Sequence, residues 1–139
     1  MSYLAKSLFE GQSIIVRLCP EADREDMTRR LSLDGIRFKV LTGAKPGAIR
    51  IGCTAPHGLI PSKIEGTPER RDDVGCLALA RSVGDSVVVT LQEGADAVLD
   101  WLASDGLVFK LNQIKTGQAV YHVIAHDGLL VLREELATG

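Results

Sequence analysis

The sequence predicts a mainly β protein with short helices, built from two copies of one small unit. Runs rich in β-branched residues, such as SIIVRL and SVVVTL, are followed or preceded by glycine-containing turns, as in short antiparallel strands. Each half of the chain also holds one short stretch with apolar residues at helical spacing. The order of these elements in the first half recurs in the second half. At 139 residues the chain has room for one domain or two very small ones.

The internal repeat is visible in three pairs of segments that keep their order and nearly their spacing. The pairs are YLAKSLFEGQSIIV with CLALARSVGDSVVV, DGIRFKV with DGLVFKL, and AIRIGCTAPHGLIPSKIE with QAVYHVIAHDGLLVLREE. They predict repeat 1 over residues 1–66 and repeat 2 over residues 76–139. The polar stretch over residues 67–75 is expected to be a linker.

Each repeat is expected to begin with a hairpin and a helix. A first strand, a glycine turn and a second, β-branched strand come first. In repeat 2 an apolar stripe at positions i, i+3, i+4 and i+7 then predicts a helix. Its residues are Ala95, Val98, Leu99 and Leu102. In repeat 1 the corresponding helix has Met27 and Leu31 on one face.

The rest of each repeat is expected to hold three more strands. Asp34-Gly35 and Asp105-Gly106 stop the helices, and IRFKVL and LVFKLN follow as third strands. The next turns fall at Pro46-Gly47 and Thr116-Gly117, and the last at Gly58 and Gly128. This gives about five antiparallel strands per repeat, with the helix inserted after the second. Neither half is large enough to bury its sheet face alone, so we expect a shared core, as in a pseudo-dimer.

Composition narrows the classes of function. A net charge of −2 means that any nucleic-acid site must be local. The chain has three cysteines without a C-x-x-C pair, which indicates reduced thiols and no metal site. No apolar run is long enough to span a membrane and the N-terminal residues lack signal-peptide features, so we expect a cytoplasmic protein. No catalytic motif is present, and neither an enzyme nor a cofactor is predicted.

Three segments carry a resemblance to a known family. They are LARSVGDS at the start of repeat 2, RIGCTAP in repeat 1, and GLLVLREEL at the end of repeat 2. Together they resemble the carbon storage regulator (CsrA/RsmA) family of bacterial RNA-binding proteins. The inserted helix is similar to that of the RsmN variant. The resemblance covers nearly the whole chain, twice.

The resemblance implies an RNA-binding post-transcriptional regulator that recognises hairpins presenting a GGA triplet. In that family an RNA site joins the first strand of one protomer to the last strand of the other, and an arginine offers a planar fork to a guanine or a phosphate. The residues at the family's contact positions are Leu79, Ala80, Arg81, Val131, Arg133 and Glu134 in repeat 2, and Lys6 and Lys63 in repeat 1. Repeat 1 departs from the pattern at Leu8, where an arginine is expected, and at Ile64.

The resemblance leaves two pairings open. If the repeats pair within one chain, we expect hybrid sites that join Lys6 and Leu8 to Arg133, and Arg81 to Lys63. If repeat 2 pairs with repeat 2 of another chain, Arg81 meets Arg133. We favour pairing within one chain, because a linker of about ten residues gives an effective concentration on the order of millimolar.

Other interpretations remain open beside RNA regulation. The chain is alternatively a diverged family member with weak or no RNA binding, acting as a protein-interaction module that self-associates or pairs with family proteins. Arg24, Arg29 and Arg30 alternate with acidic residues, which favours a salt-bridged surface helix over a phosphate contact. Trp101 is expected in the core rather than stacked on a base.

Overall fold

The structure is a computed structural model that describes residues 2–41, 47–65, 74–115 and 118–133. Within these residues the chain forms ten strands and two helices. Their bounds are β1 Ser2–Leu8, β2 Gln12–Leu18, α1 Arg24–Leu33, β3 Ile36–Leu41, β4 Ile49–Ala55, β5 Leu59–Glu65, β6 Val74–Arg81, β7 Ser86–Leu91, α2 Ala95–Ser104, β8 Leu107–Lys115, β9 Gln118–His126 and β10 Leu129–Arg133. The protein is therefore mainly β with two helices, as predicted.

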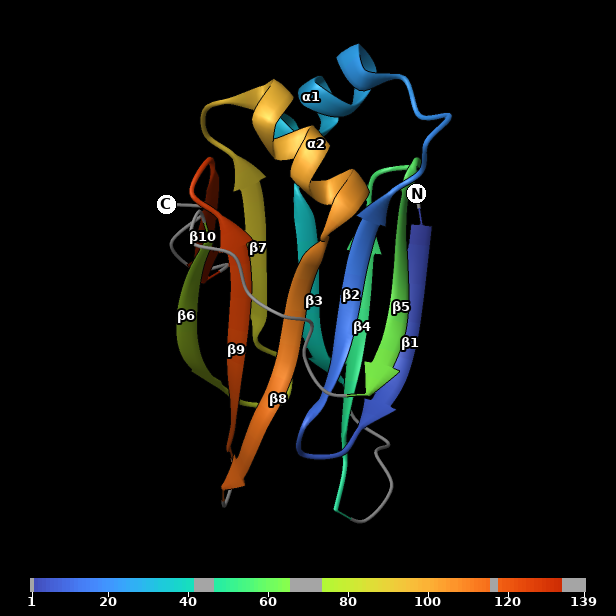
Figure 1. The fold of residues 1–139 in the computed structure, drawn as a ribbon. Coiled ribbons are helices and arrows are strands. Elements are labelled where there is room, and N and C mark those ends of the chain that lie inside the picture. Colours follow the sequence, from blue (N-terminus) through green and yellow to red (C-terminus); the bar gives the residue numbers. More distant parts are fainter. Residues whose placement is uncertain (1, 42–46, 66–73, 116–117, 134–139) are drawn as a thin grey trace.

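The strands form two five-stranded antiparallel sheets that pack face to face, and the helices cover one end of the sandwich (Figure 1). Sheet A has the order β1-β4-β3-β7-β10, and sheet B has the order β5-β2-β8-β9-β6. The hydrophobic core lies between the sheets and contains buried residues of both. No helix in the described part of the chain is long and apolar enough to cross a membrane.

Each sheet takes three strands from one half of the chain and two from the other. Sheet A combines β1, β4 and β3 with β7 and β10, and sheet B mirrors this with β6, β9 and β8 joined to β2 and β5. The seams are the pairs β3 with β7 and β2 with β8. The two halves therefore share one core, and the order strand, strand, helix, strand, strand, strand occurs twice.

The predicted linker falls largely outside the described residues. Residues 66–73 are not described, and β6 begins at Val74, whose partner on β9 is His126. The predicted turn residues Pro46, Thr116 and Gly117 also lie outside the described part.

The centre of the core is an aromatic stack contributed by both halves. Phe38 of β3 and Phe109 of β8, which occupy matching positions in the two halves, stack with ring centroids 4.3 Å apart. Tyr121 of β9 extends the stack, with its centroid 4.6 Å from that of Phe109. All three rings are at most 1% exposed. The middle strands of the two sheets are thus joined by aromatic packing.

The helices bury the predicted faces. Met27 and Leu31 of α1 are buried, as are Val98, Leu99 and Leu102 of α2. Trp101 is 4% exposed and belongs to the core, which confirms its prediction. Helix α1 begins where the Asp23 carboxylate accepts hydrogen bonds from the backbone N–H groups of Glu25 and Asp26.

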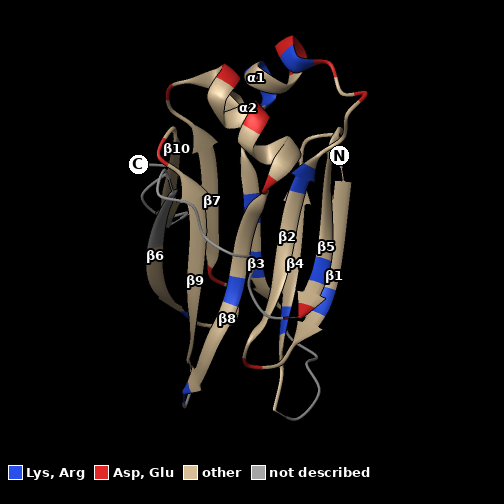
Figure 2. Ribbon diagram, viewed as in Figure 1, with Lys and Arg blue, Asp and Glu red and all other residues tan. Residues whose placement is uncertain are grey.

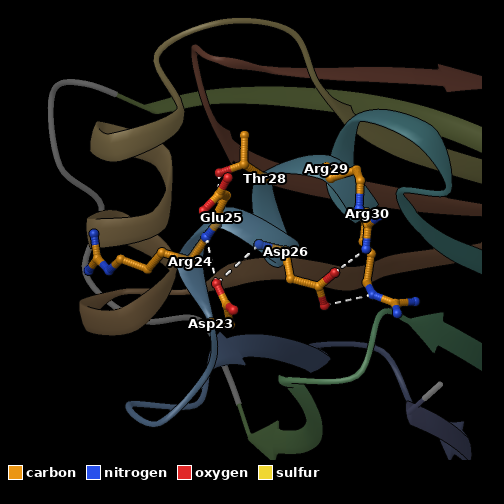
Figure 3. Close-up of polar contacts among 7 residues, drawn as sticks. All are labelled: Asp23, Arg24, Glu25, Asp26, Thr28, Arg29 and Arg30. Carbon is orange, nitrogen blue, oxygen red and sulfur yellow. Dashed lines mark hydrogen bonds and ion pairs between the residues drawn. The ribbon is translucent and has the colours of Figure 1, made fainter.

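The outer face of α1 carries the expected ion pairs (Figure 3). Asp26 accepts from Arg29 and from Arg30, the latter at 2.9 Å. Arg24, whose partner is not drawn there, pairs with Asp100 of α2 at 2.7 Å. Hydrogen bonds from Arg30 and Arg29 lower the pKa of Asp26. These arginines therefore have carboxylate partners at the helical end of the molecule, as the sequence favoured.

The glycine after each helix lies against a strand of the other half. Gly35 has φ of 71°, and a Cβ there would lie 2.5 Å from the carbonyl oxygen of Val89 on β7. Gly106 has φ of 88°, and its Cβ would lie 2.9 Å from the carbonyl oxygen of Val16 on β2. Both the left-handed backbone and the close approach require glycine at these positions.

Candidate nucleic-acid interface

The predicted site residues that the structure describes belong to the four edge strands of the sandwich. Strands β1 and β5 lie at one side of the sandwich, and β6 and β10 lie at the other (Figure 1). Each side thus combines the first and last strands of one half of the chain. We call these sides the β1–β5 edge and the β6–β10 edge.

The expected hybrid sites are not formed. Lys6 and Leu8 on β1 are separated from Arg133 on β10 by the full width of sheet A, about 19 Å for four strand spacings. Arg81 on β6 and Lys63 on β5 lie at opposite edges of sheet B in the same way. The reason is that the last strand of each half joins the other sheet while staying at its own side of the sandwich.

Strand β6 places two of the predicted RNA-binding residues inside the protein. Leu79 is 8% exposed and Arg81 is 7% exposed. Their partners on β9 are Tyr121 and Ala119, both buried, so this row of β6 side chains turns toward the other sheet. The Nε of Arg81 donates to the carbonyl oxygen of Ala80 at 2.8 Å. The Arg81 guanidinium is therefore not presented to solvent as a direct contact would require.

The other predicted RNA-binding residues of this edge are Ala80, Val131, Arg133 and Glu134. Ala80 is exposed and Val131 is half-buried. Arg133 is described by its backbone, which pairs with Val87 at the end of β10. Glu134 lies outside the described residues.

A cavity of about 280 Å³ lies at the β6–β10 edge, lined mainly by aliphatic side chains. The lining residues are Leu77, Val123, Ala125, His126, Asp127, Leu129 and Val131. Leu77 is 43% exposed. The Nδ1 of His126 accepts a hydrogen bond from the Gly128 N–H at 3.0 Å, and its ring centroid lies 5.9 Å from that of Trp101. An apolar slot with a polar rim suits a flat group that is polar at its margin.

The β1–β5 edge has a different character. Lys6 and Lys63 are exposed, whereas Leu8 is fully buried. Pro61 of β5 pairs with Val16 of β2, and β5 is an edge strand, where a proline is tolerated. A proline and lysines are the residues by which sheet edges avoid pairing with other chains.

One group of charged residues was missed by the sequence reasoning. Arg37, Lys39 and Arg50 are all exposed, on β3 and β4 in the middle of sheet A. The signal was present in IRFKVL, where Ile36, Phe38 and Val40 are buried and the basic residues alternate with them. The apolar half of this alternation predicts the strand, and the basic half marks its outward face.

In the described part of the chain, no group of three His, Cys, Asp or Glu side chains is arranged to hold a metal ion. Comparison of the chain with protein-family models, with curated proteins and with solved structures gave no match. The resemblance to the carbon storage regulator family therefore rests on the sequence segments quoted above, and the site rests on the geometry of the two edges.

Proposed function

We propose that the protein binds RNA hairpins presenting a GGA triplet at its β6–β10 edge, and thereby regulates translation of its target messages. The observation that carries the proposal is that β6 and β10, which hold the better-matched family positions, lie at the same edge of a single chain. This differs from the hybrid arrangement expected from the sequence, and it does not require a second chain.

The chemistry of this edge suits the bases of an RNA loop. As the outer strand of sheet B, β6 directs every second backbone N–H and C=O away from β9, where they are available to base edges. Exposed Ala80 has a small side chain, so a base can approach the backbone closely. The cavity beside Leu77 offers an apolar surface to an unstacked base. Arg133 ends β10 and supplies a fork that matches a guanine edge.

Arg81 is not part of the contact surface in this proposal. Its side chain is buried, and its Nε donates to the carbonyl oxygen of the preceding residue, Ala80. The β1–β5 edge has Lys63 where the β6–β10 edge has Arg133, and a lysine cannot reproduce a bidentate fork. We therefore expect one high-affinity hairpin site per chain.

The test is a titration of a labelled GGA-loop hairpin at a fixed, near-physiological salt concentration, beside a hairpin in which the triplet is CCA. The wild-type protein should bind the GGA hairpin tightly, at one hairpin per chain, and should discriminate against CCA. Arg133→Ala should weaken binding at least tenfold, since a bidentate arginine–guanine pair contributes about 1–3 kcal/mol. Lys63→Ala, at the matching position of the other half, is the control and should change affinity little. Equal binding of the two hairpins would refute the proposal.

A second candidate function is favoured by the apolar character of β6. The segment VGCLALAR has no proline and no charge before Arg81, unlike β5 with Pro61 and β1 with Lys6. Such an edge can add a strand from another protein, which would make the chain a protein-interaction module. Capture of proteins and no RNA by the tagged chain, together with loss of that capture in Ala78→Lys, would favour this function.

A further inference from the structure

We propose that the outer face of sheet A is a second RNA-contacting surface, which holds the phosphate backbone of the single strand that flanks the recognised loop. This inference rests on the proposed function, because it concerns RNA already bound at the β6–β10 edge. Its residues are Arg37, Lys39, Arg50 and Tyr3, none of which belongs to the positions implied by the family resemblance.

The strand register brings the three basic residues together. Arg37 and Lys39 are two residues apart on β3 and share one face, at a spacing of about 6.6 Å. Lys39 pairs with Gly52 on β4, and Arg50 lies two residues from Gly52 on the same face. Lys39 and Arg50 are therefore diagonal neighbours, roughly 7–8 Å apart.

The charged residues on the strands of this sheet are all basic. Strands β1, β3, β4, β7 and β10 contain no Asp or Glu. Acidic residues flank the face at two places: Asp34 at the end of α1 lines a hollow of about 410 Å³ together with Arg37 and Thr54, and Asp85 directly precedes Ser86, the β7 partner of Lys39. Figure 2 shows basic segments along β3 in a molecule whose acidic residues gather largely at the helical end. A local positive field on a chain of net charge −2 is what a phosphate-binding surface requires.

The basic residues lie two strands from the proposed hairpin site, and the β7 residues between them on this face, Val88 and Ser86, are 5% and 2% exposed. Leu132 of β10 pairs with Val88 of β7, and Val88 pairs with Arg37 of β3. The first basic residue is therefore two strands from the β6–β10 edge, about 10 Å away. An RNA strand that leaves β10 across this face meets Arg37 and Lys39 first and Arg50 next.

An exposed aromatic ring lies beyond the basic residues. Tyr3 of β1 is 62% exposed, and a Cβ at Gly52 would lie 3.0 Å from its hydroxyl oxygen. The ring therefore lies over the glycine of β4, next to Lys39 in the register. Aromatic rings on basic surfaces stack with bases of single strands without regard to sequence.

Sheet B provides a matched control. Arg17, Lys110 and Lys115 lie on its strands β2 and β8, with the same total charge. They are spread out: Lys110 pairs with Ser13, and Arg17 is four residues further along β2, about 13 Å away. Lys110 matches Lys39 in the repeat, but the position matching Arg37 is Val108, which is 3% exposed.

The experiment compares a GGA-loop hairpin with and without a single-stranded tail of about ten nucleotides. It compares wild type with the triple variant Arg37→Gln/Lys39→Gln/Arg50→Gln and with the control variant Arg17→Gln/Lys110→Gln/Lys115→Gln. The tail should increase the affinity of wild type and control, and should not increase that of the triple variant. The slope of log affinity against log salt concentration should be shallower by about 2 in the triple variant than in wild type. Between about 50 and 200 mM salt, wild type should therefore lose roughly fifteen-fold more affinity than the triple variant. Tyr3→Ala should remove part of the tail's effect, and Tyr3→Phe should keep it.

The outcomes separate this inference from the proposed function. If the GGA hairpin binds with discrimination but the triple variant keeps the full effect of the tail, the outer face is not an RNA surface. The same conclusion follows if the control variant loses the tail's effect equally. If the tailed GGA and CCA hairpins bind equally and only the triple variant loses the tail's effect, the GGA proposal fails and this surface stands. If no RNA binds, both fail. Thermal unfolding of each variant verifies that it is folded.

Discussion

Replacement of Tyr121 by phenylalanine should stabilise the protein. Tyr121 is fully buried on β9, and its hydroxyl has no hydrogen-bond partner among the described residues. Its ring stacks on Phe109 at 4.6 Å, so Tyr121→Phe keeps the aromatic packing and removes only the hydroxyl. A buried polar group without a partner costs about 1–3 kcal/mol. Allowing for the small space that the hydroxyl leaves, we expect a gain of about 1–2 kcal/mol in the free energy of unfolding.

Urea denaturation at neutral pH measures this difference, if the transition is two-state by fluorescence and circular dichroism. Tyr3→Phe, which removes a hydroxyl from an exposed ring, is the control and should stay within about 0.5 kcal/mol of wild type. A loss of stability in Tyr121→Phe would refute the reasoning, because it would show that the hydroxyl has a partner such as an internal water molecule.

The pH dependence supplies an independent test of the same site. Burial raises the pKa of Tyr121 well above its ordinary value near 10. In the unfolded chain the hydroxyl ionises near pH 10, whereas in the folded protein it stays neutral to higher pH. The stability of the wild type should therefore fall as the pH rises above about 10, and Tyr121→Phe should lose less over the same range.

Three further predictions concern other parts of the fold. Gly35→Ala should destabilise by more than about 2 kcal/mol in urea denaturation, because the Cβ adds a clash with the Val89 carbonyl to an unfavourable φ; near-wild-type stability would show that the helix end can move. Cys53, whose pKa burial raises to about 12, should resist alkylation at pH 8 while the half-buried Cys19 reacts; equal labelling by peptide mass spectrometry would contradict this. Asp26→Asn should lower stability only slightly, and about 1 M salt should reduce the difference, as for exposed ion pairs. A large or salt-independent loss would indicate another role for Asp26.

The order of the elements was predictable from the sequence because it depends on local patterns. Alternating apolar residues and turn glycines marked the strands, and the pair Met27 and Leu31 marked the buried face of α1. The partners of each strand were not predictable in the same way. Alternation tells which side chains turn inward, but it does not tell which strand lies alongside, so the exchange of strands between the halves came only from the structure.

The residues of the candidate site were likewise predictable only in part. The family resemblance assigned Arg81 to an RNA contact, and the structure shows it 7% exposed. A clue was present in the repeat itself, because the matching residue is Leu8, which is 0% exposed. A leucine at that position in one half indicates an apolar environment in both. The outward row of Arg37 and Lys39 could likewise have been identified from the strand that was already predicted.

The joining of both halves in one chain has a consequence for how this sandwich can change. In a symmetric dimer of identical subunits, a substitution at one edge appears at the other as well, so both edges must tolerate it. Here the matching positions hold Leu8 and Arg81, and Lys63 and Arg133. The two edges differ at these positions, while the seams between β3 and β7 and between β2 and β8 hold the sheets together. One edge is thus free to keep a ligand while the other loses it or acquires a different one.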